Sequence, residues 1–467
     1  MIKFGTDGWR GVIADDFTFE NVRIVAFATV KWLFSKNKNP EIVIGYDRRF
    51  LSTEFAKTAA EVFAAYNVKV FFSPDYAPTP AVSLGVTSTK ATAGIVITAS
   101  HNPYFFNGYK IKEWFGGPAD ELTTGEIEKN VSKYIENPEK IEHQKFEDAK
   151  NSGKIEIEDI KSPYVESIKK YIDRRVSKRK AIFDAMWGAS ANLSKFIFNS
   201  EEIRSEPDPT FGAYLDGNMG RPEPTPLTLT PLFKKCSNLS LDGFAVDGDG
   251  DRIAASTKNG EFIDAHKILA LLAEHLYKNR KIEGKVYKNF PTSDIVDKIS
   301  QYYGIELITT PVGFKHIAKG MKEDKVIVGG EESGGIGVPS HLLERDGLFC
   351  AALLMEMSEY EGKSLGKLVE SLEKRFGPHK YVRRDVHEKD PEKKSEYLRV
   401  AEKIDKLNNL VIETKERIDG VKLRFKKGGF LMIRPSGTEP LVRIYCEMGS
   451  FKKANKTIDS FVKLINR

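Results

Sequence analysis

Residues 94–103 read GIVITASHNP, an apolar run followed at once by a short polar turn around Ser100. The apolar half is typical of a buried strand, because a strand covered on both faces reads as a continuous apolar run. Similar runs occur at 41–46 and 69–72, and between them residues 53–65 have the apolar spacing of a helix. Strands that alternate with helices in this way predict a mixed α/β sheet.

The chain of 467 residues is too long for one ordinary hydrophobic core, so we expect three or four domains. Between 121 and 162 the sequence becomes charged and poor in large apolar residues, which predicts a domain boundary. A basic stretch at 374–384 leads into a last domain of about 90 residues. The other predicted elements are strands at 181–183, 243–246, 326–328, 430–433 and 441–445, and helices at 265–277 and 348–360.

The composition is that of a globular enzyme, with 40% hydrophobic and 30% charged residues. The net charge of +6 is small for this length, and the basic clusters are short and interrupted. This argues against a nucleic-acid partner but suits an anionic substrate. We expect the three cysteines to be reduced, because they lie far apart and form no CxxC pair. With no signal-peptide pattern and no bilayer-spanning run, we expect a cytoplasmic protein without a membrane partner.

Ser100 is a candidate nucleophile, because it follows a predicted strand on a turn with small and polar neighbours. A serine hydroxyl is a weak nucleophile unless a base removes its proton or a metal stabilises its charged product. His101 is a candidate base, and Lys110 follows shortly after. The alternative is an ordinary turn in which Ser100 caps a helix and His101 is structural.

The run DGDGDR at 247–252 places three carboxylates at every second position, separated by glycines. Glycine lets such a loop curl so that the oxygens converge on one hard cation. An EF-hand calcium loop is excluded, because its glycine and acidic positions are occupied by Arg252 and Lys258. Magnesium is the expected ion, since it keeps open positions for phosphate oxygens.

Two further polar loops follow or join predicted strands. Residues 329–335 read GGEESGG, which suits the binding of sugar hydroxyls but also fits a plain glycine-rich surface loop. Residues 434–440 read RPSGTEP, in which Arg434, two hydroxyls and an exposed backbone make a cradle for a phosphate dianion. The alternative for this second loop is a simple hairpin turn.

These four loops, together with FGTDGWRG at 4–11, resemble the α-D-phosphohexomutase superfamily of phosphoglucomutases, phosphomannomutases and phosphoglucosamine mutases. The resemblance spans nearly the whole chain. It implies an α/β fold of four domains around a central cleft, three of them related mixed α/β domains and the last a smaller α+β domain. The expected domains are 1–150 with the serine loop, 160–258 with the metal loop, 259–374 with the sugar loop and 378–467 with the phosphate loop.

The resemblance also implies a role for individual residues. Ser100 matches the phosphoserine that gives and receives the phosphoryl group, and its phosphate completes the metal site. Lys110 is a candidate general acid or base. The remaining matches are the magnesium ligands Asp247, Asp249 and Asp251, the basic residues Arg10 and Arg252 beside the reacting phosphate, the sugar-binding residues Glu331 and Ser333, the phosphate-loop residues Arg434, Ser436, Gly437 and Thr438, and the substrate contacts Lys288 and Lys315.

The implied activity is the interconversion of hexose 1-phosphate and hexose 6-phosphate, with Mg²⁺ as cofactor and a hexose 1,6-bisphosphate as intermediate and activator. Glu332 lies between Glu331 and Ser333, and this Glu-Glu-Ser order resembles phosphoglucomutase loops, which favours glucose. Mannose or glucosamine phosphates are the alternative. Two alternative functions of another class are a sugar phosphatase that uses Ser100 and an inactive sugar-phosphate sensor. Either a monomer or a homodimer is compatible with the resemblance.

Overall fold

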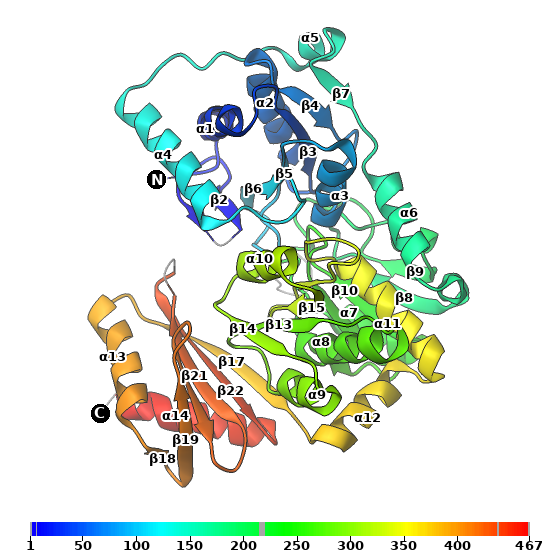
Figure 1. Ribbon diagram of the computed structural model, residues 1–467, viewed down its shortest axis with the longest axis vertical. Coiled ribbons are helices and arrows are strands. Elements are labelled where there is room, and N and C mark those ends of the chain that lie inside the picture. Colours follow the sequence, from blue (N-terminus) through cyan, green and yellow to red (C-terminus); the bar gives the residue numbers. More distant parts are fainter. Residues whose placement is uncertain (1, 6, 214–219, 437–438, 466–467) are drawn as a thin grey trace.

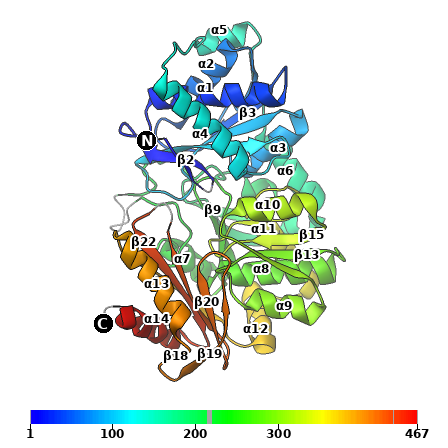
Figure 2. The same ribbon diagram turned by 60° about the vertical axis from the view of Figure 1, so that its left-hand side comes forward.

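The computed structural model describes residues 2–5, 7–213, 220–436 and 439–465. They form four β-sheets, which follow one another along the chain (Figure 1). The first sheet lies at one end of the molecule, and the second and third lie next to each other below it (Figures 1 and 2). The fourth lies beside the third. Within the described part of the chain, no helix is both long and apolar enough to cross a membrane.

The first sheet has the order β1-β2-β6-β5-β3-β4-β7. Its centre is β5, every residue of which is buried, parallel to β3 and antiparallel to β6. β7 joins this sheet although it follows residue 150, where we expect the first domain to end. The strands are β1 (Phe4–Gly5), β2 (Gly8–Val12), β3 (Glu41–Tyr46), β4 (Lys69–Phe72), β5 (Ala93–Ile97), β6 (Phe106–Glu113) and β7 (Ile155–Ile157). The helices are α1 (Phe19–Lys36), α2 (Ser52–Ala65), α3 (Thr79–Thr89), α4 (Glu121–Glu136) and α5 (Phe146–Asn151).

The second sheet has the order β12-β11-β10-β8-β9 and is also mixed. β10 is parallel to β8 and antiparallel to β11, so the loop that joins β10 to β11 is a tight turn at the sheet edge. The strands are β8 (Lys180–Asp184), β9 (Asn199–Ile203), β10 (Gly243–Val246), β11 (Ile253–Ser256) and β12 (Phe262–Ile263). The helices are α6 (Lys161–Tyr171), η1 (Arg174–Lys178), η2 (Ser194–Phe196) and α7 (Thr230–Leu239).

The third sheet has the order β14-β13-β15-β16, with β15 parallel to β13 and antiparallel to β16. The strands are β13 (Lys285–Asn289), β14 (Leu307–Thr310), β15 (Val326–Gly330) and β16 (Ile336–Gly337). The helices are α8 (Ala265–Glu274), which continues as the π-helix η3 (His275–Asn279), α9 (Ile295–Tyr303), α10 (Phe314–Glu323), α11 (Gly347–Glu361) and α12 (Leu365–Phe376).

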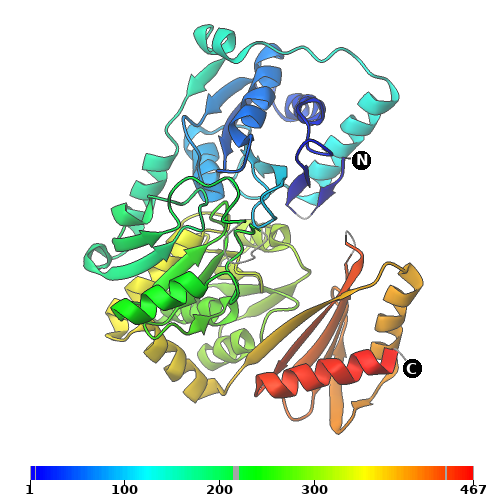
Figure 3. The same ribbon diagram turned by 180° about the vertical axis from the view of Figure 1, so that it is seen from behind.

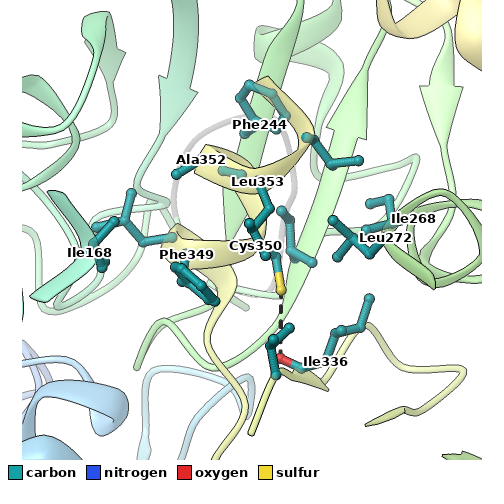
Figure 4. Close-up of a cluster of buried hydrophobic side chains, with 14 of the residues drawn as sticks. Ile168, Phe244, Ile268, Leu272, Ile336, Phe349, Cys350, Ala352 and Leu353 are labelled. Carbon is teal, nitrogen blue, oxygen red and sulfur yellow. Dashed lines mark hydrogen bonds between the residues drawn. The ribbon is translucent and has the colours of Figure 1, made fainter. Parts of the chain in front are cut away.

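The second and third sheets share one core, built around α11. Figure 4 shows Cys350 and Leu353 of this helix between Phe244 of β10 and Leu272 of α8. Burial of so much apolar surface fixes the two sheets relative to each other. All three cysteines are free and buried, as expected.

The fourth sheet is antiparallel throughout, in the order β17-β22-β21-β20-β19-β18. Figure 3 shows α14 lying across one face of it. The strands are β17 (Lys380–His387), β18 (Lys406–Leu407), β19 (Leu410–Glu416), β20 (Val421–Phe425), β21 (Phe430–Pro435) and β22 (Leu441–Met448). The helices are α13 (Pro391–Lys403) and α14 (Phe451–Ile465). The predicted α/β fold, with a separate C-terminal sheet, is confirmed.

Candidate active site

Ser100 lies on the turn directly after β5, with 1% of its surface exposed. Its φ of 55° is in the left-handed region, which turns the side chain out of the path of the strand. The hydroxyl Oγ donates a hydrogen bond to Asp247 Oδ2 at 2.8 Å. The serine loop of the first sheet therefore meets the metal loop of the second.

Arg49 holds the serine loop in this shape. Its guanidinium pairs with buried Asp47 at 3.0 Å, and Thr98 Oγ1 donates to the same carboxylate at 2.5 Å. The rest of the guanidinium donates to four carbonyl oxygens of the loop, those of Ser100 (2.6 Å), Asn102 (2.8 Å), Pro103 (2.9 Å) and Phe106 (3.1 Å). The planar fork of arginine suits such multiple bonding.

His101 lies directly beside Ser100. Its Nδ1 lies 3.4 Å from Ser100 Oγ. Burial, and then the charges of Arg252 and Arg10, hold the pKa of His101 well below its usual range. The imidazole is therefore neutral at pH 7, and in this arrangement it is a weak base.

Asp247, Asp249 and Asp251 converge in the loop after β10. Their nearest carboxylate oxygens lie within 4.8 Å of one another, and all three residues are buried. Burial, and then the charges of the other two aspartates, raise the pKa of Asp247 well above its usual range. Asp249 Oδ1 and Asp251 Oδ1 are buried with no hydrogen-bond donor among the described residues. Free oxygen ligands in such a cluster are what a hard divalent cation needs, so these residues fit Mg²⁺.

Gly248 allows the metal loop to approach the serine loop this closely. A Cβ atom at this position would lie 2.5 Å from the carbonyl oxygen of Ser100, closer than Cβ atoms approach such an oxygen. The loop is also closed on itself, because Asp247 Oδ1 accepts from the backbone N–H groups of Asp251 (3.0 Å) and Arg252 (3.1 Å).

Lys110 lies on β6 and points its amine into the aspartate cluster. Its Nζ is 2.7 Å from Asp249, 2.9 Å from Asp251 and 2.8 Å from Asp7. Burial by itself lowers the pKa of Lys110, but these three carboxylates outweigh it and raise the pKa above its usual value. The lysine is therefore a fixed cation in this arrangement, which makes it a poor proton acceptor.

Arg10 and Arg252 place two guanidinium groups beside the serine loop. Arg10 Nη1 donates to the side chain of Asn102 at 2.7 Å. Arg252 Nε lies 4.0 Å from Asp247 and is buried without an acceptor among the described residues. An unused buried donor at this point suits an anion on Ser100.

Glu331 and Ser333 lie in the loop after β15, which is joined to the metal loop by a backbone hydrogen bond from Ile253 to Gly334 (3.0 Å). Gly334 has a φ of 97°, and a Cβ there would lie 2.6 Å from the Ile253 carbonyl oxygen, so only glycine fits. Glu331 is 6% exposed, and its burial raises its pKa to about 7, although nearby Arg345 opposes the shift.

Arg434 lies at the end of β21, in the fourth sheet. Its Nε donates to Asp419 Oδ2 at 2.9 Å. The backbone N–H of Val312, which lies between β14 and α10, donates to the same oxygen at 3.0 Å. Ser436 is 7% exposed and accepts from the backbone N–H of Glu439 at 3.1 Å. The predicted residues Gly437 and Thr438 lie outside the described residues.

Lys315 and Lys288 have partners away from the aspartate cluster. Lys315 Nζ of α10 lies 2.7 Å from Glu121 of α4, so it links a helix of the third sheet to a helix of the first. Lys288 is buried and pairs with Asp297. Neither contacts the cluster among the described residues, and their predicted contact with substrate stays a prediction.

Sequence reasoning missed the charged residues that surround the cluster. Arg345 bridges three parts of the site: it pairs with Asp7, lies 2.7 Å from Asp251 and lies 3.7 Å from Glu331. Asp47 and Arg49 were also missed. Their position directly after the buried run 41–46 is the signal that could have found them. The other missed residues are Thr79, which donates to Asp249 at 2.5 Å, and the buried pair of Lys112 and Glu344 at 2.5 Å.

The family models for phosphoglucomutase/phosphomannomutase match this chain over most of its length. The alpha/beta/alpha domain I matches residues 1–138, the alpha/beta/alpha domain III matches 264–376 and the C-terminal domain matches 382–464. This chain belongs to the phosphoglucomutase/phosphomannomutase family. The family consists of mutases, that is, phosphotransferases of carbohydrate metabolism.

Relatives match the chain from end to end. A phosphoglucomutase/phosphomannomutase of Thermococcus kodakarensis is 30% identical over 99% of this chain and 98% of its own length. A phosphoglucosamine mutase of Carboxydothermus hydrogenoformans is 29% identical over 99% of both chains. The crystal structure of a Thermus thermophilus protein, provisionally named a phosphomannomutase, superposes with a TM-score of 0.85 at 31% identity, covering 100% of this chain and 99% of that one.

Proposed function

We propose that this family member moves a phosphoryl group between the 1- and 6-hydroxyls of a hexose, and that Ser100 carries the group between them. The observation that supports this best is the hydrogen bond of 2.8 Å from Ser100 Oγ to Asp247 in a buried aspartate cluster. A phosphate on Ser100 would stand between that cluster and Arg252, whose buried Nε has no acceptor among the described residues.

Mg²⁺ is the proposed cofactor, held by Asp247, Asp249 and Asp251 together with the Ser100 phosphate. When bound, it would neutralise charge on the oxygens of the transferring phosphoryl group. The proposal is supported by the two carboxylate oxygens that lack donors and by the oxygen-only ligand set.

The transfer itself exchanges one phosphorus–oxygen bond for another. The bond from phosphorus to Ser100 Oγ breaks as a bond to the sugar hydroxyl forms, and the hydroxyl proton ends on Ser100 Oγ. His101 is the proposed carrier of this proton, because its Nδ1 lies 3.4 Å from Oγ. Lys110, the other candidate, is assigned instead to charge balance. The second half-reaction is the reverse, with the other phosphate of the hexose 1,6-bisphosphate returning to Ser100.

The remaining predicted residues complete the substrate site in this proposal. Arg434, Ser436, Gly437 and Thr438 would hold the phosphate that does not react, and Glu331 and Ser333 would hold the sugar hydroxyls. The sugar must reverse between the two half-reactions. The part of the chain that carries the fourth sheet therefore has to release the sugar and bind it again. A hexose 1,6-bisphosphate would serve as activator, because it can rephosphorylate a bare Ser100.

The names of the relatives bear on the sugar. Relatives at 29–30% identity are named phosphoglucosamine mutase or phosphoglucomutase/phosphomannomutase, and the similar crystal structure bears a phosphomannomutase name. They support the alternative, mannose or glucosamine phosphate, better than the glucose preference expected from the Glu-Glu-Ser loop. We therefore propose these two sugars ahead of glucose.

A side-by-side assay tests this choice. Glucosamine 1-phosphate, mannose 1-phosphate and glucose 1-phosphate are each supplied with Mg²⁺ and a trace of the matching 1,6-bisphosphate, and kcat/KM is compared. The proposal expects the highest value for glucosamine or mannose phosphate. A higher value for glucose phosphate would restore the expectation from the loop. A cytoplasmic location and the oligomeric state, monomer or homodimer, stay predictions.

A further inference from the structure

Asn289 is the last residue of β13 and lies directly beside the sugar loop, residues 329–335. β13 and β15 are parallel neighbours in the third sheet, so their carboxyl ends meet at one edge (Figure 1). Glu331 follows β15 immediately, and Asn289 is buried with 0% of its surface exposed. A buried amide needs hydrogen-bond partners, and the sugar loop supplies three of them.

The side-chain amide of Asn289 contacts both carboxylates of this loop. Its Nδ2 donates to Glu332 Oε2 at 2.9 Å and, over a longer distance, to Glu331 Oε1 at 3.4 Å. Its Oδ1 accepts from the backbone N–H of Glu332 at 3.3 Å and from Thr292 Oγ1. A backbone N–H can only donate, so the amide oxygen must face it and the amino group must face the two carboxylates.

Glu331 and Glu332 place two acidic side chains next to each other, one of them buried and the other half-buried. Burial raises the pKa of Glu331 to about 7, the charge of Arg345 opposes this shift, and the charge of Glu332 adds to it. Like charges this close repel each other, so the two carboxylates need a shared donor to stay side by side. The amino group of Asn289 is such a donor, and a hydrogen bond to a carboxylate is stronger than one between neutral groups.

The backbone at Asn289 is held from two sides. Phe290, the next residue, donates its backbone N–H to the carbonyl oxygen of Thr310 in β14 at 2.9 Å. The ring of Phe290 is fully buried and packs with Phe430 and Met432 of β21, the strand that leads into the phosphate loop. The amide of Asn289 therefore has a fixed place between the sugar loop and the sheet that carries the phosphate loop, as a group that orients others must have.

We propose that Asn289 is a positioning residue of the substrate site, which holds Glu331 and Glu332 at the spacing that the sugar hydroxyls require. Asn289 acts through these two carboxylates and does not contact the reacting groups. It therefore contributes to the binding of the sugar and much less to the transfer of the phosphoryl group. This inference rests on the proposed function, in which Glu331 and Ser333 hold the sugar hydroxyls.

Mutase kinetics of Asn289→Ala and Asn289→Asp test the proposal, with thermal unfolding as a check that each variant folds. Alanine removes the amide, and aspartate replaces the shared donor with a third carboxylate. For the hexose 1-phosphate that wild type converts fastest, we expect KM to rise at least about tenfold in both variants, with a smaller change in kcat. Asn130→Ala on α4 is the matched control, because its amide donates to the Ala28 carbonyl at 3.2 Å, within the first part of the chain. We expect this control to keep the wild-type KM and kcat.

An unchanged KM in both Asn289 variants, or a fall in kcat at constant KM, would overturn the proposal. Hydrogen exchange without substrate separates this failure from a failure of the proposed function, which would show as a wild type inactive on every hexose phosphate. We expect the backbone amides of residues 329–335 to exchange faster in Asn289→Ala than in wild type, and those of residues 98–103 to exchange alike. Equal exchange of residues 329–335 in both proteins would show that Asn289 does not hold the sugar loop, whatever the activity of the wild type.

Discussion

Ser100 Oγ donates a hydrogen bond of 2.8 Å to Asp247 Oδ2, although the two residues are 147 positions apart and belong to different sheets. This contact joins the candidate nucleophile to the candidate metal site. It depends on a loop that Arg49 shapes and on a glycine, Gly248, that permits the approach.

Arg49→Ala should destabilise the protein by about 3–5 kcal/mol and abolish most activity, because it leaves the buried Asp47 carboxylate unpaired and frees the serine loop. Thermal unfolding and the mutase assay measure the two effects. Arg48→Ala is the matched control. Arg48 is next to Arg49 in the sequence, but it is only partly buried and contacts Tyr76 instead of the serine loop. Equal stability losses in both variants would contradict the role given to Arg49.

Asp249→Asn should weaken the response to Mg²⁺, because it removes one anionic ligand from the proposed site. In wild type we expect Mg²⁺ at 100 times its dissociation constant to stabilise the fold by about 2.7 kcal/mol, and the variant should lose most of this at the same concentration. Thermal unfolding with and without Mg²⁺ measures it. Asp120→Asn is the control, since Asp120 is exposed and asparagine caps α4 as well as aspartate does. A wild-type protein indifferent to Mg²⁺ would refute the assignment.

Glu331 should make stability depend on pH. Its pKa is raised to about 7 in the folded chain from an ordinary 4.5, chiefly by burial. Between these values the unfolded chain loses the proton while the folded chain keeps it, so stability falls as pH rises from about 4.5 to about 7. The loss attributable to this residue is about 3 kcal/mol.

Glu331→Gln should remove that part of the pH dependence. Urea unfolding of wild type and variant at pH 5 and pH 8 gives the difference, with Glu126→Gln on exposed α4 as the control. If wild type and Glu331→Gln show the same change in midpoint between the two pH values, Glu331 is not the group responsible.

Asp419→Ala should raise KM for the sugar phosphate about tenfold or more with a smaller change in kcat, because Arg434 loses the carboxylate that orients its Nε. Asp405→Ala, on an exposed aspartate that pairs with Lys415, is the control from the same part of the chain. A fall in kcat at unchanged KM would show that Asp419 does not act through substrate binding.

The elements that carry chemistry could be predicted from the sequence, because each loop follows a short apolar strand. β3, β5, β10 and β15 lie where the apolar runs predict them, and helix α11 at Gly347–Glu361 matches the prediction of 348–360. The contact between Ser100 and the aspartates also follows from the resemblance. These signals are local, so a single sequence is enough to read them.

The charged residues around the cluster could not be predicted in the same way. Arg345 pairs with Asp7, which is 338 positions away in the sequence. The residues on either side of Arg345 resemble those of any polar loop. The state of Lys110 depends on three carboxylates that only folding brings together. Likewise, the sharing of α11 between two sheets follows from packing and not from any pattern within the helix.

Phosphorus NMR of the mutase reaction with wild type and Ser100→Ala tests the role of Ser100 most directly. The reaction contains a hexose 1-phosphate, Mg²⁺ and a trace of the matching 1,6-bisphosphate. We expect wild type to form the 6-phosphate without free phosphate and Ser100→Ala to lose at least about a thousandfold in rate, as expected when a nucleophile is removed. Release of inorganic phosphate by wild type, or a Ser100→Ala variant that keeps most of its rate, would contradict the phosphoserine mechanism.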